Sequence, residues 1–299
     1  MTTGPGHMTP ASPLDDFKRI AGACLAVALV IFSAVVITAL IVPPLLPVGA
    51  MTAGSDGGPT NAATWANLIG FQILATLFIV VFVDRRFAGR VAFILALGPP
   101  RVPVARIAST FAFIAVALAL LSLFSYTFFR DDLLGDLRVF QKIMADTPAI
   151  VPILALVIGA PVSEEVLFRG YLLNRLAHTR LGFAGASVLA TLAWTLLHFG
   201  YSAIGLFEVF AAGLLFSWAL WRTGSLWVPI VFHAIYNAVV FVIISSIPLA
   251  PIGKGRTNGL EALDAAVSRP NAPRARDRRP QNRSHRHRYA QRVRPSNAV

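Results

Sequence analysis

Two adjacent carboxylates stand inside an apolar stretch of the chain. Glu164 and Glu165 follow a hydrophobic run over residues 149–160 and precede another one. An ionised group at bilayer depth costs about 2.5 kcal/mol or more, so intramembrane carboxylates usually face a polar interior and serve a function there. On a helix, Glu165 can pair with Arg169, four residues on, while Glu164 points about 100° away. The spacing predicts that Glu165 is held by Arg169 and that Glu164 is free for chemistry.

Two further polar pairs lie in later apolar stretches. Trp194 and His198 are four residues apart, as are His233 and Asn237. A spacing of four places both members of each pair on one helical face. The indole ring of Trp194 can therefore pack beside the imidazole of His198. Together with the glutamates, these residues predict a site that activates water in a low-dielectric environment.

The residue types fit either of two mechanisms. A carboxylate can act as a general base toward water, while an imidazole and an amide can donate to the oxyanion that forms at a carbonyl. The set of Glu164, His198 and His233 can instead hold a zinc ion that keeps a water molecule in its open position. The sequence leaves both mechanisms open.

The composition indicates which elements position these residues. Of 299 residues, 56% are hydrophobic and 13% are charged, with a mean hydropathy of +0.67. Several apolar runs reach the length of about 20 residues that a membrane-spanning helix needs. We therefore predict an all-α, polytopic transmembrane helical bundle. Its seven expected spans cover residues 20–47, 63–83, 106–129, 148–163, 183–199, 203–221 and 226–249.

Short segments between the spans complete this prediction. The apolar piece 91–97 is too short to span and is expected to be interfacial or re-entrant, which would make an eighth membrane segment. The helix of the fourth span should continue through the glutamate pair to residue 176. The segment 130–146, with four acidic and three basic residues, is expected to be a loop on the outer side.

The domain organisation follows from these patterns. Residues 1–17 are expected to be disordered, 18–147 to form N-terminal transmembrane helices, and 148–250 to form the catalytic core. Residues 251–299 hold 12 Lys and Arg against 3 Asp and Glu and therefore supply +9 of the net charge of +12. We expect this tail to be disordered and to interact with anionic lipid headgroups rather than with nucleic acid.

The chain resembles the CPBP family of intramembrane proteases, also called the Abi family, which includes the type II CAAX prenyl proteases. Three motifs carry the resemblance: EExxxR at 164–169, [FW]xxxH at 194–198 and HxxxN at 233–237. They occur in this order on separate apolar stretches, and the resemblance covers about residues 148–245. The HExxH, GxSG and GxGD patterns of other intramembrane proteases are not found on apolar stretches of the sequence.

The resemblance implies a role for each motif residue. Glu164 and His198 would activate the attacking water, and His233 and Asn237 would stabilise the oxyanion. Glu165 and Arg169 would support the site structurally. Members are classed as metalloproteases, so Zn²⁺ bound by the glutamate and the two histidines stays an open possibility. Glu208, inside the sixth expected span, receives no role.

These observations predict an endopeptidase that hydrolyses a peptide bond in a membrane-embedded or lipidated polypeptide. The enzyme would be a multi-pass protein of the cell membrane, and the Ala-, Arg- and Pro-rich composition suggests a bacterial plasma membrane. The alternative is a non-enzymatic bacteriocin-immunity or scaffold protein that uses the same polar cavity for binding.

Overall fold

A computed structural model describes residues 12–54 and 57–246 of the chain. This part of the chain contains helices and no strand, which confirms the prediction of an all-α fold. The predicted basic tail and residues 1–11 lie outside the described residues. Within residues 12–54 and 57–246, six helices are long and apolar enough to cross a membrane, and the segment Gly182–His198 forms a shorter apolar helix. These seven segments correspond to the seven predicted spans.

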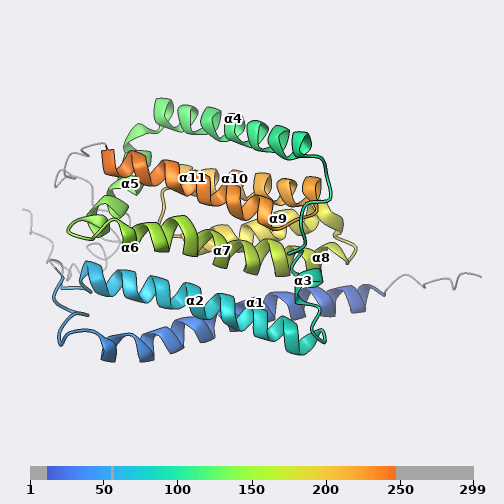
Figure 1. The fold of residues 1–299 in the computed structure, drawn as a ribbon, viewed down its shortest axis with the longest axis horizontal. Helices are drawn as coiled ribbons and strands as arrows, with labels where there is room; N and C mark the ends of the chain where they lie inside the picture. Colours follow the sequence, from blue (N-terminus) through green and yellow to red (C-terminus); the bar gives the residue numbers. More distant parts are fainter. Residues whose placement is uncertain (1–11, 55–56, 247–299) are drawn as a thin grey trace, which may run out of the picture. The chain divides into compact units, whose positions relative to one another are not determined.

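The helices are shown in Figure 1. The elements before the glutamate pair are α1 (Pro13–Ile41), η1 (Pro43–Leu45), α2 (Asn61–Arg86), α3 (Val91–Ile94), α4 (Val104–Phe128) and α5 (Arg130–Met144). A continuous helix follows, made of α6 (Ile150–Pro152), η2 (Ile153–Gly159), α7 (Ala160–Glu164), η3 (Glu165–Leu173) and α8 (Asn174–Ala177). The last elements are α9 (Gly182–Thr195), η4 (Leu196–His198), α10 (Ala203–Thr223) and α11 (Trp227–Ser246).

The first helix begins earlier than hydrophobicity alone predicts. The side chain of Ser12 accepts a hydrogen bond from the backbone N–H of Asp15, and the carboxylate of Asp15 accepts one from the backbone N–H of Ser12. Pro13 occupies the first helical position. This capping box satisfies N–H groups that would otherwise lack a partner, so residues 13–17 are helical although the sequence suggested disorder.

The segment expected to be an outer loop is the helix α5, so that prediction was wrong. Among its charged residues, α5 carries apolar residues three or four positions apart, which is helical spacing. These residues are Leu133, Leu137, Phe140 and Met144. None of its residues is fully buried, as is usual for a helix with only one apolar face.

The predicted interfacial piece contains only the four-residue helix α3 and does not span. Its following residues are held by the start of α11. The backbone N–H of Leu226 donates to the carbonyl of Ala96 at 2.9 Å, and the indole N–H of Trp227 donates to that of Leu97 at 2.8 Å. These contacts place residues 96 and 97 against the start of α11.

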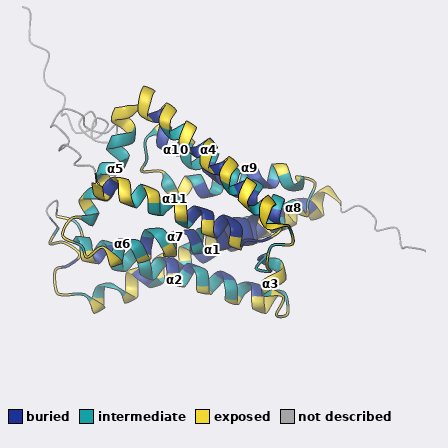
Figure 2. Cartoon of the chain, turned by 45° about the horizontal axis from the view of Figure 1, so that its top comes forward, coloured by how far each residue is buried: buried dark blue, intermediate teal, exposed yellow. Residues whose placement is uncertain are grey.

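The helix from Ile150 to Ala177 lies in the middle of the bundle. It contacts α2 on one side and α9 and α11 on the other, while α4 packs on α10. In Figure 1, the hairpin of α1 and α2 and the helix α4 lie on opposite sides of it. Figure 2 shows burial concentrated on the central helices and exposure on the outward faces of α1 and α4. These outward faces carry large apolar residues such as Phe32 and Val116, as expected of surfaces that face lipid.

Candidate active site

The helix that carries the glutamate pair is wound as a π-helix on both sides of it, in η2 and η3. A π-helical N–H normally bonds to the carbonyl five residues back, and π-helical turns are frequent at functional sites. Pro161 lies five residues after Leu156 but has no N–H to donate. The carbonyl of Leu156 instead accepts a hydrogen bond from the side-chain amide of Asn237, at 2.8 Å.

Glu165 joins two helices through one of its oxygen atoms. Its Oε1 atom accepts a hydrogen bond from Nη1 of Arg169 at 3.1 Å and lies 3.0 Å from Nδ1 of His233. The side chains of Glu165 and Arg169 are 0% exposed, and that of His233 is 5% exposed. The predicted ion pair is therefore present. In addition, the carboxylate orients the imidazole of His233, which the sequence did not indicate.

This contact determines which nitrogen of His233 faces the site. When Nδ1 donates to the carboxylate of Glu165, Nε2 is the free nitrogen, and it lies 4.0 Å from Oε2 of Glu164. The same Oε2 atom accepts a hydrogen bond from the indole N–H of Trp194 at 2.7 Å. The side chain of Glu164 is 21% exposed. Glu164 is thus the more accessible carboxylate of the pair.

Trp194 is the centre of an aromatic cluster around the site. Its ring lies 5.2 Å from that of His198 and 5.7 Å from that of His233, both edge-on. The guanidinium of Arg169 stacks over it at 4.2 Å. The sequence predicted only the contact with His198. Trp194 in fact connects both histidines, the structural arginine and the accessible glutamate.

A glycine makes room for the buried arginine. A Cβ atom at Gly213 of α10 would lie 2.6 Å from Nη2 of Arg169 and 2.9 Å from the ring of Trp194. Cγ2 of Thr191 would be closer still, at 2.5 Å, and Cβ atoms essentially never approach other atoms this closely, so a larger residue would displace one or more of these three side chains. The cation–π contacts of Arg169 depend on this gap in the surface of α10.

His198 follows α9 at the end of a short 3₁₀ turn. Its Nδ1 atom lies 3.2 Å from the carbonyl of Trp194. If Nδ1 donates to that carbonyl, Nε2 is left as an acceptor. His198 is half-buried and reaches the cluster through its edge-on contact with Trp194.

Tyr201 is a neighbour of the site that the motifs did not indicate. Its ring packs edge-on against that of His198, with centroids 5.2 Å apart, and against Phe140 of α5 at 5.9 Å. Burial, followed by the nearby carboxylates of Glu164 and Asp136, raises the pKa of its hydroxyl. The phenol therefore stays protonated and can only donate from its hydrogen or accept as a neutral group. An aromatic three residues after the histidine was the one signal available in the sequence.

The loop between His198 and α10 is fixed by α5. The carboxylate of Asp136 accepts hydrogen bonds from the backbone N–H of Ser202 at 2.9 Å and from its hydroxyl at 2.7 Å. The hydroxyl of Ser202 in turn caps the first turn of α10. α5 therefore holds the chain segment that carries His198 and Tyr201, although the sequence gave it no such role.

Asn237 lies one turn after His233 on α11, as predicted. One of its amide hydrogens is used by the carbonyl of Leu156, and an amide carries two. Its first role is thus to tie α11 to the π-helical segment η2. The second hydrogen is the one that remains for the expected oxyanion.

The three predicted zinc ligands do not form a metal site as they are arranged. Among the described residues, no three His, Cys, Asp or Glu side chains form a group that could hold a metal ion. One oxygen of Glu164 is engaged by the indole of Trp194, a neutral donor that a ligating oxygen would have to share. Glu208 of α10 is half-buried, and its Oε1 atom has no hydrogen-bond partner in the described part of the chain.

The comparison with protein families agrees with this geometry. Residues 146–239 match the family described as type II CAAX prenyl endopeptidase Rce1-like. The segment contains all seven motif residues and confirms the predicted resemblance to the CPBP and CAAX protease family, over almost the predicted range. No curated protein and no solved structure matched the chain.

Proposed function

From the match of residues 146–239 to the Rce1-like endopeptidases, we propose that the protein is an intramembrane endopeptidase that uses Glu164 to activate water. The apolar helices make it a multi-pass membrane protein. Its substrate would be a membrane-embedded or lipidated polypeptide, because such a chain reaches a site between membrane-spanning helices most easily. The observation that carries the proposal is the separation of roles in the glutamate pair: Glu165 is fully buried and bonded twice, whereas Glu164 is accessible.

The first step would be the attack of water on the peptide carbonyl. Glu164 accepts a proton from the water molecule, while Nε2 of His198 helps to orient it. The oxygen of the water bonds to the carbonyl carbon, and the carbonyl oxygen becomes an oxyanion. His233 can donate to this oxyanion from Nε2 when both its nitrogens carry protons, since Nδ1 already faces Glu165. The second amide hydrogen of Asn237 is the other donor.

The second step would break the carbon–nitrogen bond. The proton held by Glu164 moves to the amide nitrogen, which leaves as an amine, and the oxyanion collapses to a carboxylic acid. Trp194 supports both steps because its N–H holds Oε2 of Glu164 at 2.7 Å and restricts the rotation of the carboxylate. Glu165 and Arg169 act as positioning residues, since they hold His233 without touching the reacting atoms.

The decisive experiment is unbiased mass spectrometry of new peptide termini in membranes that contain the wild type or Glu164→Ala. We expect termini that appear only with the wild type, and a loss of turnover of at least about 100-fold in the variant. Because Glu164 is 21% exposed, the variant should fold, which gel filtration in detergent checks. Equal termini in both samples from folded proteins would contradict the proposal. A phenotype that persists in the variant without new termini would favour the binding or immunity function.

A further inference from the structure

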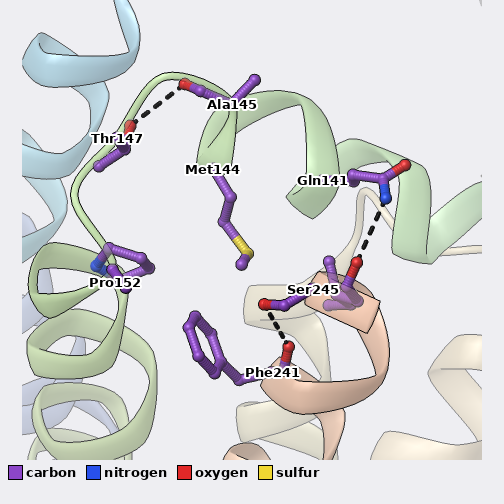
Figure 3. A pocket seen from close by; sticks show the side chains of 9 residues that line it. Gln141, Met144, Ala145, Thr147, Pro152, Phe241 and Ser245 are labelled. Carbon is purple, nitrogen blue, oxygen red and sulfur yellow. Dashed lines mark hydrogen bonds between the residues drawn. The ribbon is translucent and has the colours of Figure 1, made fainter. Parts of the chain in front are cut away.

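A pocket lies where α5, the start of α6 and the end of α11 meet (Figure 3). Its volume is about 290 Å³. Met144 of α5, Pro152 of α6 and Phe241 of α11 form three of its walls, and Ile244 extends the last. This volume is at the small end of ligand pockets, which range from about 300 to 1,000 Å³.

The interior of this pocket is apolar although three of its lining residues are polar. Ser245 donates its hydroxyl hydrogen to the carbonyl of Phe241 at 2.8 Å, and Thr147 donates to that of Ala145. The amide of Gln141 donates to the carbonyl of Ile244 at 3.2 Å. Figure 3 shows these polar groups turned toward the backbone at the rim. The ligand that matches such a lining is a hydrocarbon group of limited size.

One wall lies one helical turn from a residue of the candidate site, and the other two lie one turn from residues that contact the site or its neighbour Tyr201. Phe241 follows Asn237 by four residues on α11. Pro152 precedes Leu156, whose carbonyl accepts the amide of Asn237, by four residues.

The third wall is connected to the site through ring contacts that start on α5. Met144 follows Phe140 by four residues on α5. The ring of Phe140 contacts Tyr201, and Tyr201 contacts His198. Three elements therefore lead from the walls of the pocket to residues that contact the candidate site.

The helical rise gives the distance between the pocket and the chemistry. At about 1.5 Å per residue, Phe241 lies about 6 Å along α11 from Asn237 and about 12 Å from His233. An extended peptide advances about 3.3 Å per residue. A substrate whose cleaved bond lies at His233 would thus place its third or fourth residue from that bond at the pocket.

We propose that this pocket is a specificity site that binds one large aliphatic or aromatic side chain of the substrate polypeptide, three or four residues from the cleaved bond. The proposal rests on the proposed protease function. The small volume and the satisfied polar rim favour a single side chain over the long hydrocarbon chain of a lipid anchor. Burial of one such side chain is worth at least a tenfold gain in affinity.

Two variants of α5 separate an effect of filling the pocket from an effect of adding a tryptophan elsewhere on the same helix. Met144 is half-buried and lines it, so Met144→Trp fills the space. Val139, on the same helix, is 57% exposed and does not line the pocket, so Val139→Trp adds the same side chain elsewhere. Neither residue belongs to the proposed catalytic machinery.

A binding measurement tests the pocket without any need for turnover. The Glu164→Gln protein is titrated with short labelled peptides of alanine and serine that carry either one leucine or none. We expect the leucine peptide to bind about tenfold more tightly, Met144→Trp to abolish this difference, and Val139→Trp to preserve it. A leucine preference that is absent, or that survives Met144→Trp, would overturn the proposal.

The pattern of cleavage gives the second test. Termini produced by the wild type should share a large apolar residue three or four positions from the cut, and Met144→Trp should reduce these termini about tenfold while Val139→Trp does not. Identical cleavage patterns for the two variants would also overturn the specificity site. If the wild type yields no new termini, the proposed protease function is contradicted. The peptide titration is independent of turnover and shows separately whether the pocket binds a large apolar side chain.

Discussion

Nδ1 of His233 and Oε1 of Glu165 lie 3.0 Å apart, although 68 residues separate them in the chain. This contact gives Glu165 a second structural role. Glu165 does more than neutralise Arg169, because it also sets the orientation of His233 toward Glu164. A carboxylate that accepts from one nitrogen of a histidine and so fixes the other is a recurrent device in metal sites and catalytic sites.

Loss of one partner of the buried ion pair should destabilise the protein strongly. Glu165→Ala leaves the guanidinium of Arg169 buried at 0% exposure without its carboxylate. Breaking such a pair costs about 3–5 kcal/mol. Chemical unfolding in detergent should show this loss. The double variant Glu165→Ala/Arg169→Leu should recover part of it, and a double variant as unstable as the two single variants combined would contradict the pairing.

The gap at Gly213 should be intolerant of a single methyl group. Gly213→Ala places a Cβ atom 2.6 Å from Nη2 of Arg169, so the guanidinium must shift and weaken its stack on Trp194. We expect a lower melting temperature and a reduced kcat. Gly22→Ala is the matched control, because a Cβ atom there meets nothing within 4 Å. That control should be neutral or slightly stabilising. Equal behaviour of the two variants would refute the close approach.

The buried phenol of Tyr201 should make stability depend on alkaline pH. Its raised pKa means that the folded protein binds the phenol proton more strongly than the unfolded chain does. The stabilising contribution is therefore fully present below the ordinary pKa of about 10 and is lost as the pH rises above it. Tyr201→Phe should flatten the decline of unfolding free energy above pH 10, by up to about 1.4 kcal/mol per pH unit.

Metal removal tests the zinc alternative directly. Since Glu164, His198 and His233 do not form a three-ligand group in the described structure, we expect a chelator such as 1,10-phenanthroline to leave turnover unchanged. Purified protein should contain zinc well below one equivalent by elemental analysis. Stoichiometric zinc, together with activity that is lost on chelation and restored by Zn²⁺, would show that the two histidines and the glutamate rearrange around an ion.

The sequence by itself determined the features that depend on local spacing and hydrophobicity. The apolar runs predicted the spans because a helix across hydrocarbon must be apolar over its whole length. The pairing of Glu165 with Arg169 followed from their separation by four residues, which brings them together on any helix. The accessible position of Glu164 followed from the same geometry. Segment 130–146 was misjudged because its charges outweighed an apolar stripe that covers only one face.

Only the tertiary structure decided how the motif helices meet. The contact of His233 with Glu165, the bond from Trp194 to Glu164 and the attachment of Asn237 to Leu156 join residues that are 68, 30 and 81 positions apart. Spacing along a helix gives the direction of a side chain but not its partner on another helix. The position of α5 against the His198 loop is of the same kind, since it depends on Asp136 reaching Ser202, 66 residues away. Packing of whole helices sets these contacts, and no local pattern encodes them.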